Sequence, residues 1–256
     1  MRWHSALSEQ ADVDLAVAEA ARAIAEQIRP ETVDLVLLFV TPHFASAYRR
    51  IPAIVASHFP NGLLFGSSAG GVIAEGHEVE QRLGLSLTVA ALPEVELRSF
   101  HLDGSHLPGP SAPARDWIDL VGVEPAQAPR FLLLPDGLTC NVSELINGLD
   151  LAYPEQAKVG GIASGGVIPG SNALFCGDRV ERGGVIGLTM TGNLEVDTVV
   201  AQGCRPIGEP MLITQCQGAS IQELGGSDPV TVLRALYRTL GPRDQELFQQ
   251  TLFFGV

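Results

Sequence analysis

Two glycine-rich segments and one loop hold the residues of this sequence that could do chemistry. A glycine turn after a strand lets a ligand approach the backbone closely and can present several N–H groups to an anion or carboxylate. The alternative, that these glycines only allow tight turns and close sheet packing, stays open because short glycine motifs often occur by chance. The candidate ligand contacts in the two segments are Gly66, Ser67, Ser68, Gly70 and Gly71, and, about 95 residues later, Gly161, Ser164, Gly165 and Gly166.

The loop from Pro135 to Asn141 follows an apolar run and precedes a helical pattern, which is where open α/β sheets tend to bind ligands. Asp136, Thr139 and Asn141 are therefore candidate contacts as well. Asp and Asn are also common turn and cap residues, so Asp136 as a turn residue and Asn141 as a helix cap form the alternative interpretation.

Two further residues are weaker candidates. Arg205 lies among turn formers and could bind a ligand carboxylate with its forked guanidinium, although an exposed or structurally paired arginine explains it as well. Cys140 would be a nucleophile if the helix N-terminus stabilised its thiolate, but no obvious His and acid accompany it, so a small buried thiol is the simpler interpretation. We expect no catalytic constellation.

Composition narrows the class of partner. The chain has 256 residues, of which 46% are hydrophobic and 18% charged, and its formal net charge is −13. This balance indicates a core-forming globular protein and argues against nucleic-acid or anionic-membrane binding, both of which depend on clustered Lys and Arg. The four cysteines lack zinc-ligand spacing, neither glycine segment fits a phosphate fingerprint, and we expect no metal or cofactor. No signal peptide or spanning stretch is evident, which predicts a cytoplasmic protein whose partner is a small molecule or another protein.

The glycine segments belong to a longer repeat. At the offset of 95 residues the apolar run Val36–Phe39 lies on Phe131–Leu134, and at an offset of 100 residues Leu83–Ala90 lies on Gly183–Met190. The change of offset requires five extra residues between Pro169 and Arg182, which we place in a loop or hairpin tip. The chain is thus predicted to be a duplication, with a first copy over 1–102, a linker over 103–113, a second copy over 114–202 and a third region over 203–256.

The elements that must position the candidate residues follow from hydrophobic periodicity. We expect helices over 12–28, 45–59 with a kink or a break at Pro52, 114–121, from 142 onward and over 228–240. Strands are expected over 33–40, 63–65, 83–90, 95–100, 131–134, 184–190, 194–201, 211–214, 221–224 and from 252, with 83–90 and 95–100 paired about Pro93-Glu94. The fold class is α/β, with mixed sheets covered by helices, and an αββα sandwich is one form it could take.

Motifs along the chain resemble those of the FIST family. They are Gly66–Ile73, Leu133–Asp136, Tyr153-Pro154, Gly160-Gly161, Gly184–Leu188, Gln202–Gly208 and Gly218–Gly226. The resemblance implies a FIST-N region over about 33–200 and the start of a FIST-C region that stops early here. It also implies an intracellular sensory domain that binds small ligands such as amino acids, in some proteins beside a signalling output domain or an F-box. No catalytic residues carry over.

These observations lead to one functional expectation and one alternative. The expectation is a non-enzymatic sensory module, acting in signal transduction with a possible signalling protein partner. Its ligand, an amino acid or another small carboxylate, binds where Gly66–Gly71 and Gly161–Gly166 meet the loop Asp136–Asn141 in a single cleft. The alternative is a protein-interaction scaffold or substrate-recognition module without a small ligand, and an enzyme using Cys140 ranks third.

Overall fold

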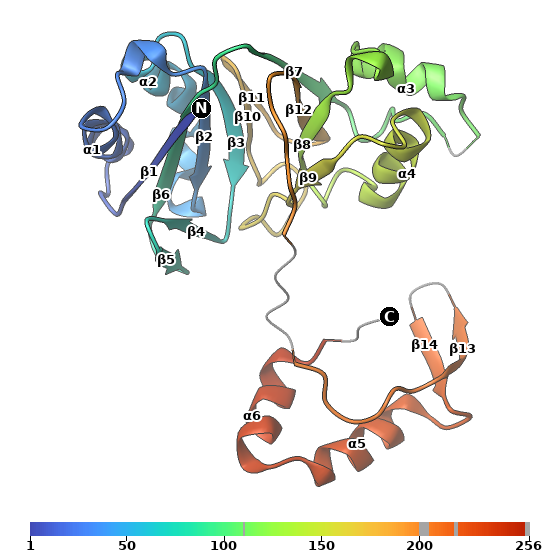
Figure 1. Ribbon diagram of the computed structural model, residues 1–256. Coiled ribbons are helices and arrows are strands. Elements are labelled where there is room, and N and C mark those ends of the chain that lie inside the picture. Colours follow the sequence, from blue (N-terminus) through green and yellow to red (C-terminus); the bar gives the residue numbers. More distant parts are fainter. Residues whose placement is uncertain (110, 200–204, 218–219, 254–256) are drawn as a thin grey trace. The chain divides into compact units, whose positions relative to one another are not determined.

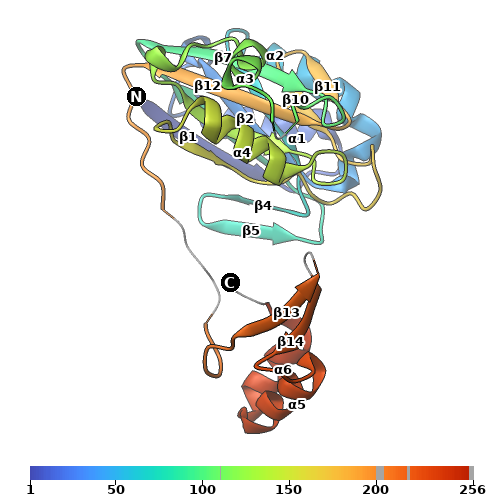
Figure 2. The ribbon, with the colours of Figure 1, turned by 90° about the vertical axis from the view of Figure 1, so that its right-hand side faces the viewer.

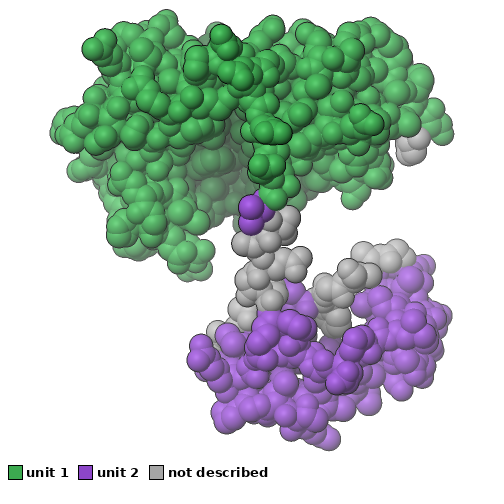
Figure 3. Space-filling view, viewed as in Figure 1, with its two compact units in different colours: residues 1–198 green, residues 199–256 purple. Residues whose placement is uncertain are grey.

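The computed structural model describes residues 1–109, 111–199, 205–217 and 220–253. The chain forms two compact units, residues 1–198 and residues 199–256, which are coloured separately in Figure 3. The boundary lies close to residue 203, where the sequence predicts that the third region begins.

The first unit runs through the same order of elements twice. The first series is β1 (Arg2–Ser8), α1 (Val13–Ala25), β2 (Leu35–Val40), α2 (Ile51–His58), β3 (Leu63–Ser68), β4 (Gly71–Ala74), β5 (His77–Glu80) and β6 (Leu85–Ala91). The second series is β7 (Val95–Leu102), α3 (Ala114–Val121), β8 (Arg130–Pro135), α4 (Val142–Ala152), β9 (Lys158–Gly160), β10 (Leu174–Cys176), β11 (Arg179–Glu181) and β12 (Val185–Gly192). Short 3-10 turns occur at Pro30–Thr32, Pro42–Arg50 and Pro125–Gln127.

Two mixed sheets hold most of these strands (Figure 1). Their strand orders are β1-β6-β2-β3-β10-β11 and β7-β12-β8-β9, and β4 and β5 form a separate two-stranded sheet. In the first sheet β2 is parallel to β3 and antiparallel to β6, and in the second β8 is parallel to β9 and antiparallel to β12. The pairs Val40↔Leu85 and Pro135↔Val185 differ by 95 and 100 residues, the two offsets found in the sequence. This agreement is what the duplication hypothesis predicts.

The first unit is an αββα sandwich, the arrangement that the sequence allowed (Figures 1 and 2). Strand β2 shows why, because neighbouring side chains point to opposite faces of a strand. Val36, Leu38 and Val40 pack in a core with α1 and α2. Leu35 lies in a second core between the two sheets, and Leu37 and Phe39 pack against that core. Helices α3 and α4 cover the far side of the second sheet over a third core that contains Trp117 and Leu145.

One expected strand pairing is wrong. Strands β6 and β7 do not form a hairpin about Pro93-Glu94, because β6 is already flanked by β1 and β2, and β7 pairs with β12 instead. The chain therefore crosses from the first sheet to the second at residues 92–94. Residues 103–113, which we expected to link the copies, connect β7 with α3, and both of these elements belong with the second sheet.

Other differences concern elements that were not predicted, predicted strands that are absent, and the start of one helix. Strand β1 and helix α6 (Pro242–Thr251) were not expected, and residues 194–199 form no strand. In the 45–59 region a 3-10 turn precedes α2, with Pro52 in the first turn of that helix, where a missing N–H costs little. The expected strand from 252 is absent at residues 252 and 253, and residue 254, like residues 200 and 201 of the expected strand 194–201, lies outside the described residues.

The second unit contains a β-hairpin and two helices. They are β13 (Ile213–Gln217), β14 (Ser220–Leu224), α5 (Pro229–Thr239) and α6. The side chain of Asp228 accepts a hydrogen bond from the Thr231 N–H and so caps α5. Across the described residues of both units, no helix is long and apolar enough to cross a membrane.

Candidate ligand-binding site

The two glycine segments lie side by side, as the sequence predicts. The Gly70 N–H donates to Ser164 Oγ at 3.0 Å, and the Ser164 N–H donates to the carbonyl of Ser68 at 3.2 Å. Asp136 forms a parallel bridge with Ala163, which brings the third predicted part of the site against the second segment. The predicted proximity of these three parts of the chain is therefore confirmed.

The residues of the two segments that occupy equivalent positions in the structure are offset by one from those that the sequence repeat aligns. A Cβ atom on Gly66 would lie 1.8 Å from the carbonyl oxygen of Leu38, and one on Gly160 would lie 1.8 Å from that of Leu133. The structural counterpart of Gly66 is thus Gly160 and not Gly161. At both positions the glycine is needed because the neighbouring strand leaves no room for a side chain, which is the packing interpretation that the sequence left open.

A layer of buried polar side chains holds the three parts together. Asp136 is fully buried, and its Oδ2 accepts a hydrogen bond from Thr139 Oγ1 at 2.7 Å while its Oδ1 accepts one from Asn172 Nδ2 at 2.9 Å. Asn172 Oδ1 in turn accepts hydrogen bonds from Ser68 Oγ at 3.1 Å and from the Gly166 N–H at 2.8 Å. The side chains of Asp136 and Ser68 therefore bind groups of the protein itself and hold the segments from the buried side.

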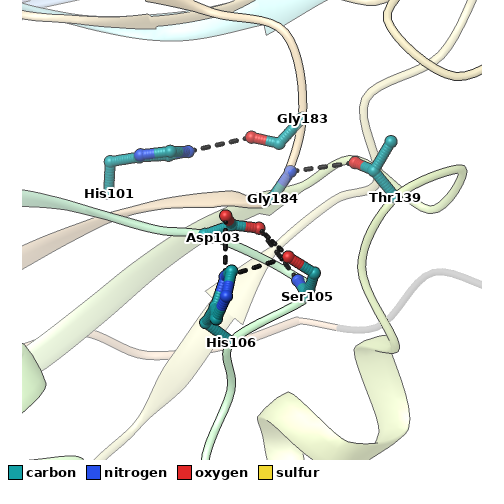
Figure 4. A network of polar contacts seen from close by, with 7 residues as sticks. All are labelled: His101, Asp103, Ser105, His106, Thr139, Gly183 and Gly184. Atoms are coloured by element: carbon teal, nitrogen blue, oxygen red, sulfur yellow. Dashed lines mark hydrogen bonds and ion pairs between the residues drawn. The ribbon is translucent and has the colours of Figure 1, made fainter.

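Thr139 extends this layer toward the start of β12 (Figure 4). Besides donating to Asp136, its Oγ1 accepts a hydrogen bond from the Gly184 N–H at 2.9 Å, and His101 Nε2 lies 2.9 Å from the carbonyl oxygen of Gly183. The loop after β7 packs on the same turn, because a Cβ atom on Gly104 would lie 2.2 Å from the Thr139 carbonyl oxygen.

That loop carries an Asp, a Ser and a His in contact, but not as a catalytic triad. In Figure 4, Asp103 Oδ2 and Ser105 Oγ both approach the Nδ1 atom of His106, at 2.9 and 3.0 Å. A triad requires the serine and the acid at different nitrogens of the ring. Hydrogen bonds from the Ser105 backbone and side chain, and then from His106, lower the pKa of Asp103 to about 2. The three exposed residues form a local turn in which the carboxylate is an acceptor.

Several glycines and one serine of the two segments are exposed to solvent over this layer. Gly70, Gly161, Ser164 and Gly165 are exposed, whereas Ser67 is buried like Ser68 and Asp136. Within the described part of the chain, no group accepts a hydrogen bond from the Gly165 N–H. Figure 3 shows a hollow in the face of the first unit that it presents, between the elements that Figure 1 labels β4 and β9.

The same four residues behave differently in the two segments. Gly70-Gly71-Val72-Ile73 leads into β4, and Val72 is 3% exposed. Gly165-Gly166-Val167-Ile168 forms no strand, and Val167 is 87% exposed. The second segment therefore exposes at Val167 the position that is packed at Val72, whereas the isoleucines Ile73 and Ile168 are exposed in both segments, at 68% and 64%.

The remaining candidates have structural partners. Asn141 caps α4, with Oδ1 accepting from the Glu144 N–H at 3.3 Å, so the cap interpretation is confirmed. Arg205 belongs to the second unit, where it forms an ion pair with Asp244 at 2.6 Å. Gly71 and Gly166 are half-buried.

Cys140 lies under the Asp136 turn and is 7% exposed. Burial raises the pKa of its thiol, and the neighbouring carboxylates of Asp136 and Glu144 raise it further. A raised pKa leaves less thiolate at neutral pH, and the thiolate is the nucleophilic form.

We expect Cys140 to react with iodoacetamide at neutral pH more slowly than a free thiol, and its rate to rise with increasing pH. Mass spectrometry of labelled peptides measures the rate, and the exposed Cys216 of the same chain is the internal control. Labelling of Cys140 as fast as Cys216 would contradict the geometry and revive the nucleophile hypothesis.

Sequence reasoning missed two buried polar residues beside the segments. Asn172 lies in the stretch Pro169–Arg182 that holds the five-residue insertion, which was the available signal, although nothing in that stretch singles out this residue. Tyr48 is fully buried, packs edge-on against Phe175 and lies under the guanidinium of Arg182, which is 5.2 Å from the ring centroid. In the described residues its hydroxyl has no hydrogen-bond partner of normal geometry, and burial raises its pKa against the smaller opposing effects of Arg182 and the Ser68 hydroxyl.

Comparisons with known proteins identify the family. The model described as "FIST N domain" matches residues 34–227, so the chain belongs to the FIST N domain family. The chain is 35% identical over its whole length to "Uncharacterized protein Rv0628c" of Mycobacterium tuberculosis H37Rv and 32% identical over 96% of its length to "Uncharacterized protein Mb0898c" of Mycobacterium bovis. It spans 65% and 61% of the lengths of these relatives.

Proposed function

We propose that this protein is a cytoplasmic sensory module that binds a small ligand, an amino acid or another small carboxylate, where its two glycine segments meet. The observation that carries the proposal is the junction of Gly70 with Ser164, which joins exposed glycine backbone from both halves over the hydrogen-bonded layer of Asp136, Asn172 and Ser68. Such a layer keeps the surface groups in place, and pre-organised groups lower the entropy cost of binding.

The chemistry of the junction favours an anionic group on the ligand. The free N–H of Gly165 is a donor, the Ser164 hydroxyl is exposed beside it, and the carboxylate of Asp136 is buried and already accepts hydrogen bonds. Backbone N–H groups in a concave turn are a common way of binding carboxylates and phosphates. Direct contact in this proposal is limited to the exposed candidates Gly70, Gly161, Ser164 and Gly165.

A thermal-shift screen tests this function. We expect a mixture of the common amino acids, or acetate and succinate singly, to raise the melting temperature of the chain. A ligand at 100 times its dissociation constant adds about 2.7 kcal/mol, or roughly 5–10 °C for a protein of this size.

Gly161→Val and Gly109→Val supply a matched pair of variants. A Cβ atom at either glycine meets nothing within 4 Å, so both variants should fold, but only the substitution at Gly161 would place a side chain on the junction. Loss of the ligand-induced shift in Gly161→Val alone supports the site. Equal shifts in both variants, or no shift for the wild type with any probe, would count against it.

A protein-interaction surface is the second candidate function, favoured by the exposed apolar side chains of Ile162, Val167 and Ile168. Exposed apolar groups gathered on one segment mark binding surfaces. Substituting Val167 and Ile168 by Ser should then abolish capture of a signalling partner in a cross-linking pull-down while leaving the thermal shift by small ligands unchanged.

A further inference from the structure

We propose that Asn172 is the positioning residue of this site, holding the second glycine segment in the open form that exposes its backbone. The effect on ligand binding rests on the proposed function. The structural part, the hold of Asn172 on the segment, can be tested without a ligand. The group that holds the segment is the side-chain amide of Asn172, a residue that is 1% exposed.

Asn172 joins all three parts of the site. Its Nδ2 donates to Asp136 Oδ1 at 2.9 Å and lies 3.4 Å from the carbonyl oxygen of Ala163, and its Oδ1 accepts from Ser68 Oγ and from the Gly166 N–H. One side chain therefore contacts the first segment, the Asp136 turn and the second segment. A buried amide with both ends bonded in this way has one favoured orientation.

Between Ser164, whose N–H is bonded to Ser68, and Ile168, the second segment has no hydrogen-bonded backbone group among the described residues except the Gly166 N–H. Residues 161–171 contain no helix or strand, and Val167 and Ile168 are too exposed to anchor it by packing. In the first segment the equivalent Gly71-Val72 enters β4 and pairs with β5. The identical Gly-Gly-Val-Ile sequence can thus form a strand, and in the second half the amide of Asn172 takes the Gly166 N–H that a strand partner would otherwise bind.

The backbone carbonyl of Asn172 also faces the edge of the first sheet. Arg182 Nη1 donates to it at 3.4 Å, and the next residue, Ala173, bonds to Ser68 through both its N–H and its carbonyl. The main chain at 172–173 is therefore fixed to β3, and the side chain of Asn172 transfers that rigidity to Gly166. Without the amide, the segment would keep its end points and lose its central attachment.

Hydrogen exchange on the full chain tests the structural part. In Asn172→Ala we expect the hydrogen-bonded amides of Ser164, Gly166 and Ile168 to exchange about ten-fold faster or more, while amides of β2 and β6 change little. Thr189→Val is the matched control, because Thr189 is also 1% exposed and its hydroxyl bonds to the carbonyl of Arg98, away from the segments. This control should leave exchange at 164–168 unchanged.

A second variant covers the case in which Asn172→Ala fails to fold. Ser68→Ala removes one of the hydrogen bonds to the Asn172 amide, together with the acceptor of the Ala173 N–H, and keeps the other hydrogen bonds of Asn172. It should therefore raise exchange at 164–168 by a smaller factor. Exchange that rises equally in β2, β6 and 164–168, or not at all, would show that Asn172 acts only as a core residue and would overturn the proposal.

The binding part uses the amino-acid mixture, acetate and succinate as probes. If one of them stabilises the wild type, the shift should be lost in folded Asn172→Ala and kept in Thr189→Val; retention in both variants overturns the inference alone. If no probe stabilises the wild type, the proposed function fails, and the exchange result still decides whether Asn172 holds the segment.

Discussion

Gly66→Ala is expected to prevent folding or to lower the free energy of unfolding by more than about 4 kcal/mol. The added Cβ atom would lie 1.8 Å from the carbonyl oxygen of Leu38, and both atoms belong to central strands of the first sheet. A contact this short cannot be relieved by a side-chain rotation, because the opposing atom is backbone. Strands β2 and β3 would have to separate, which breaks their ladder and opens two cores.

Gly70→Ala, four residues later in the same segment, is the control. Its Cβ atom would approach no atom closer than 3.9 Å, so the change in stability should stay within about 0.5 kcal/mol. Urea denaturation followed by the fluorescence of the buried Trp117 measures both variants. Similar stabilities for the two would mean that the close approach of β2 and β3 at Gly66 is wrong.

Asp136→Ala has the second-largest expected effect, a loss of about 3–5 kcal/mol. The carboxylate is fully buried and accepts hydrogen bonds from Thr139 Oγ1, Asn172 Nδ2 and the Leu138 N–H. Each donor left without an acceptor in the interior costs about 1–3 kcal/mol. Asp136→Asn should cost less, because its amide oxygen, in the place of Oδ1, still accepts the hydrogen bonds from Asn172 Nδ2 and the Leu138 N–H.

The exposed Asp178, in the turn between β10 and β11, provides the comparison for Asp136. Asp178→Ala should change the free energy of unfolding by no more than about 0.5 kcal/mol in the same urea titration. If Asp136→Ala is as mild as this control, the buried polar layer does not hold the segments and the site loses its physical basis.

Local signals in the sequence predicted several elements well. The apolar run Val33–Val40 indicated a central strand, and β2 has cores on both of its faces. Asn141 with Glu144 three residues later predicted the start of α4, and the cap is present. These predictions succeeded because period, capping and strand length depend on residues close together in the chain.

Long-range pairing was harder to predict. Strands β6 and β7 follow one another with a turn between them, and the sequence contains no sign that β1 already occupies the edge of β6. Strand β1 carries polar residues and no apolar run, so its pairing with β6 is decided by contacts between residues more than 75 positions apart.

The candidate site shows the same division. The repeat predicted that the two glycine segments and the Asp136 turn meet, but it assigned Asp136, Ser67 and Ser68 to direct ligand contact, whereas all three are buried. Burial depends on what packs over a residue. Here Asn172, from a stretch with an insertion that the first half lacks, turns the polar atoms of Asp136 and Ser68 inward.

The sequence by itself therefore determined the α/β class, the family, the repeated order of elements and the meeting of the two glycine segments, because these follow from periodicity and repetition along the chain. Only the tertiary structure decided which strands became neighbours, which glycines are packing residues and which backbone is exposed. The tetrapeptide Gly-Gly-Val-Ile makes the reason plain. With β5 as a partner it forms a strand and buries Val72, and with the amide of Asn172 as a partner it stays irregular and exposes Val167.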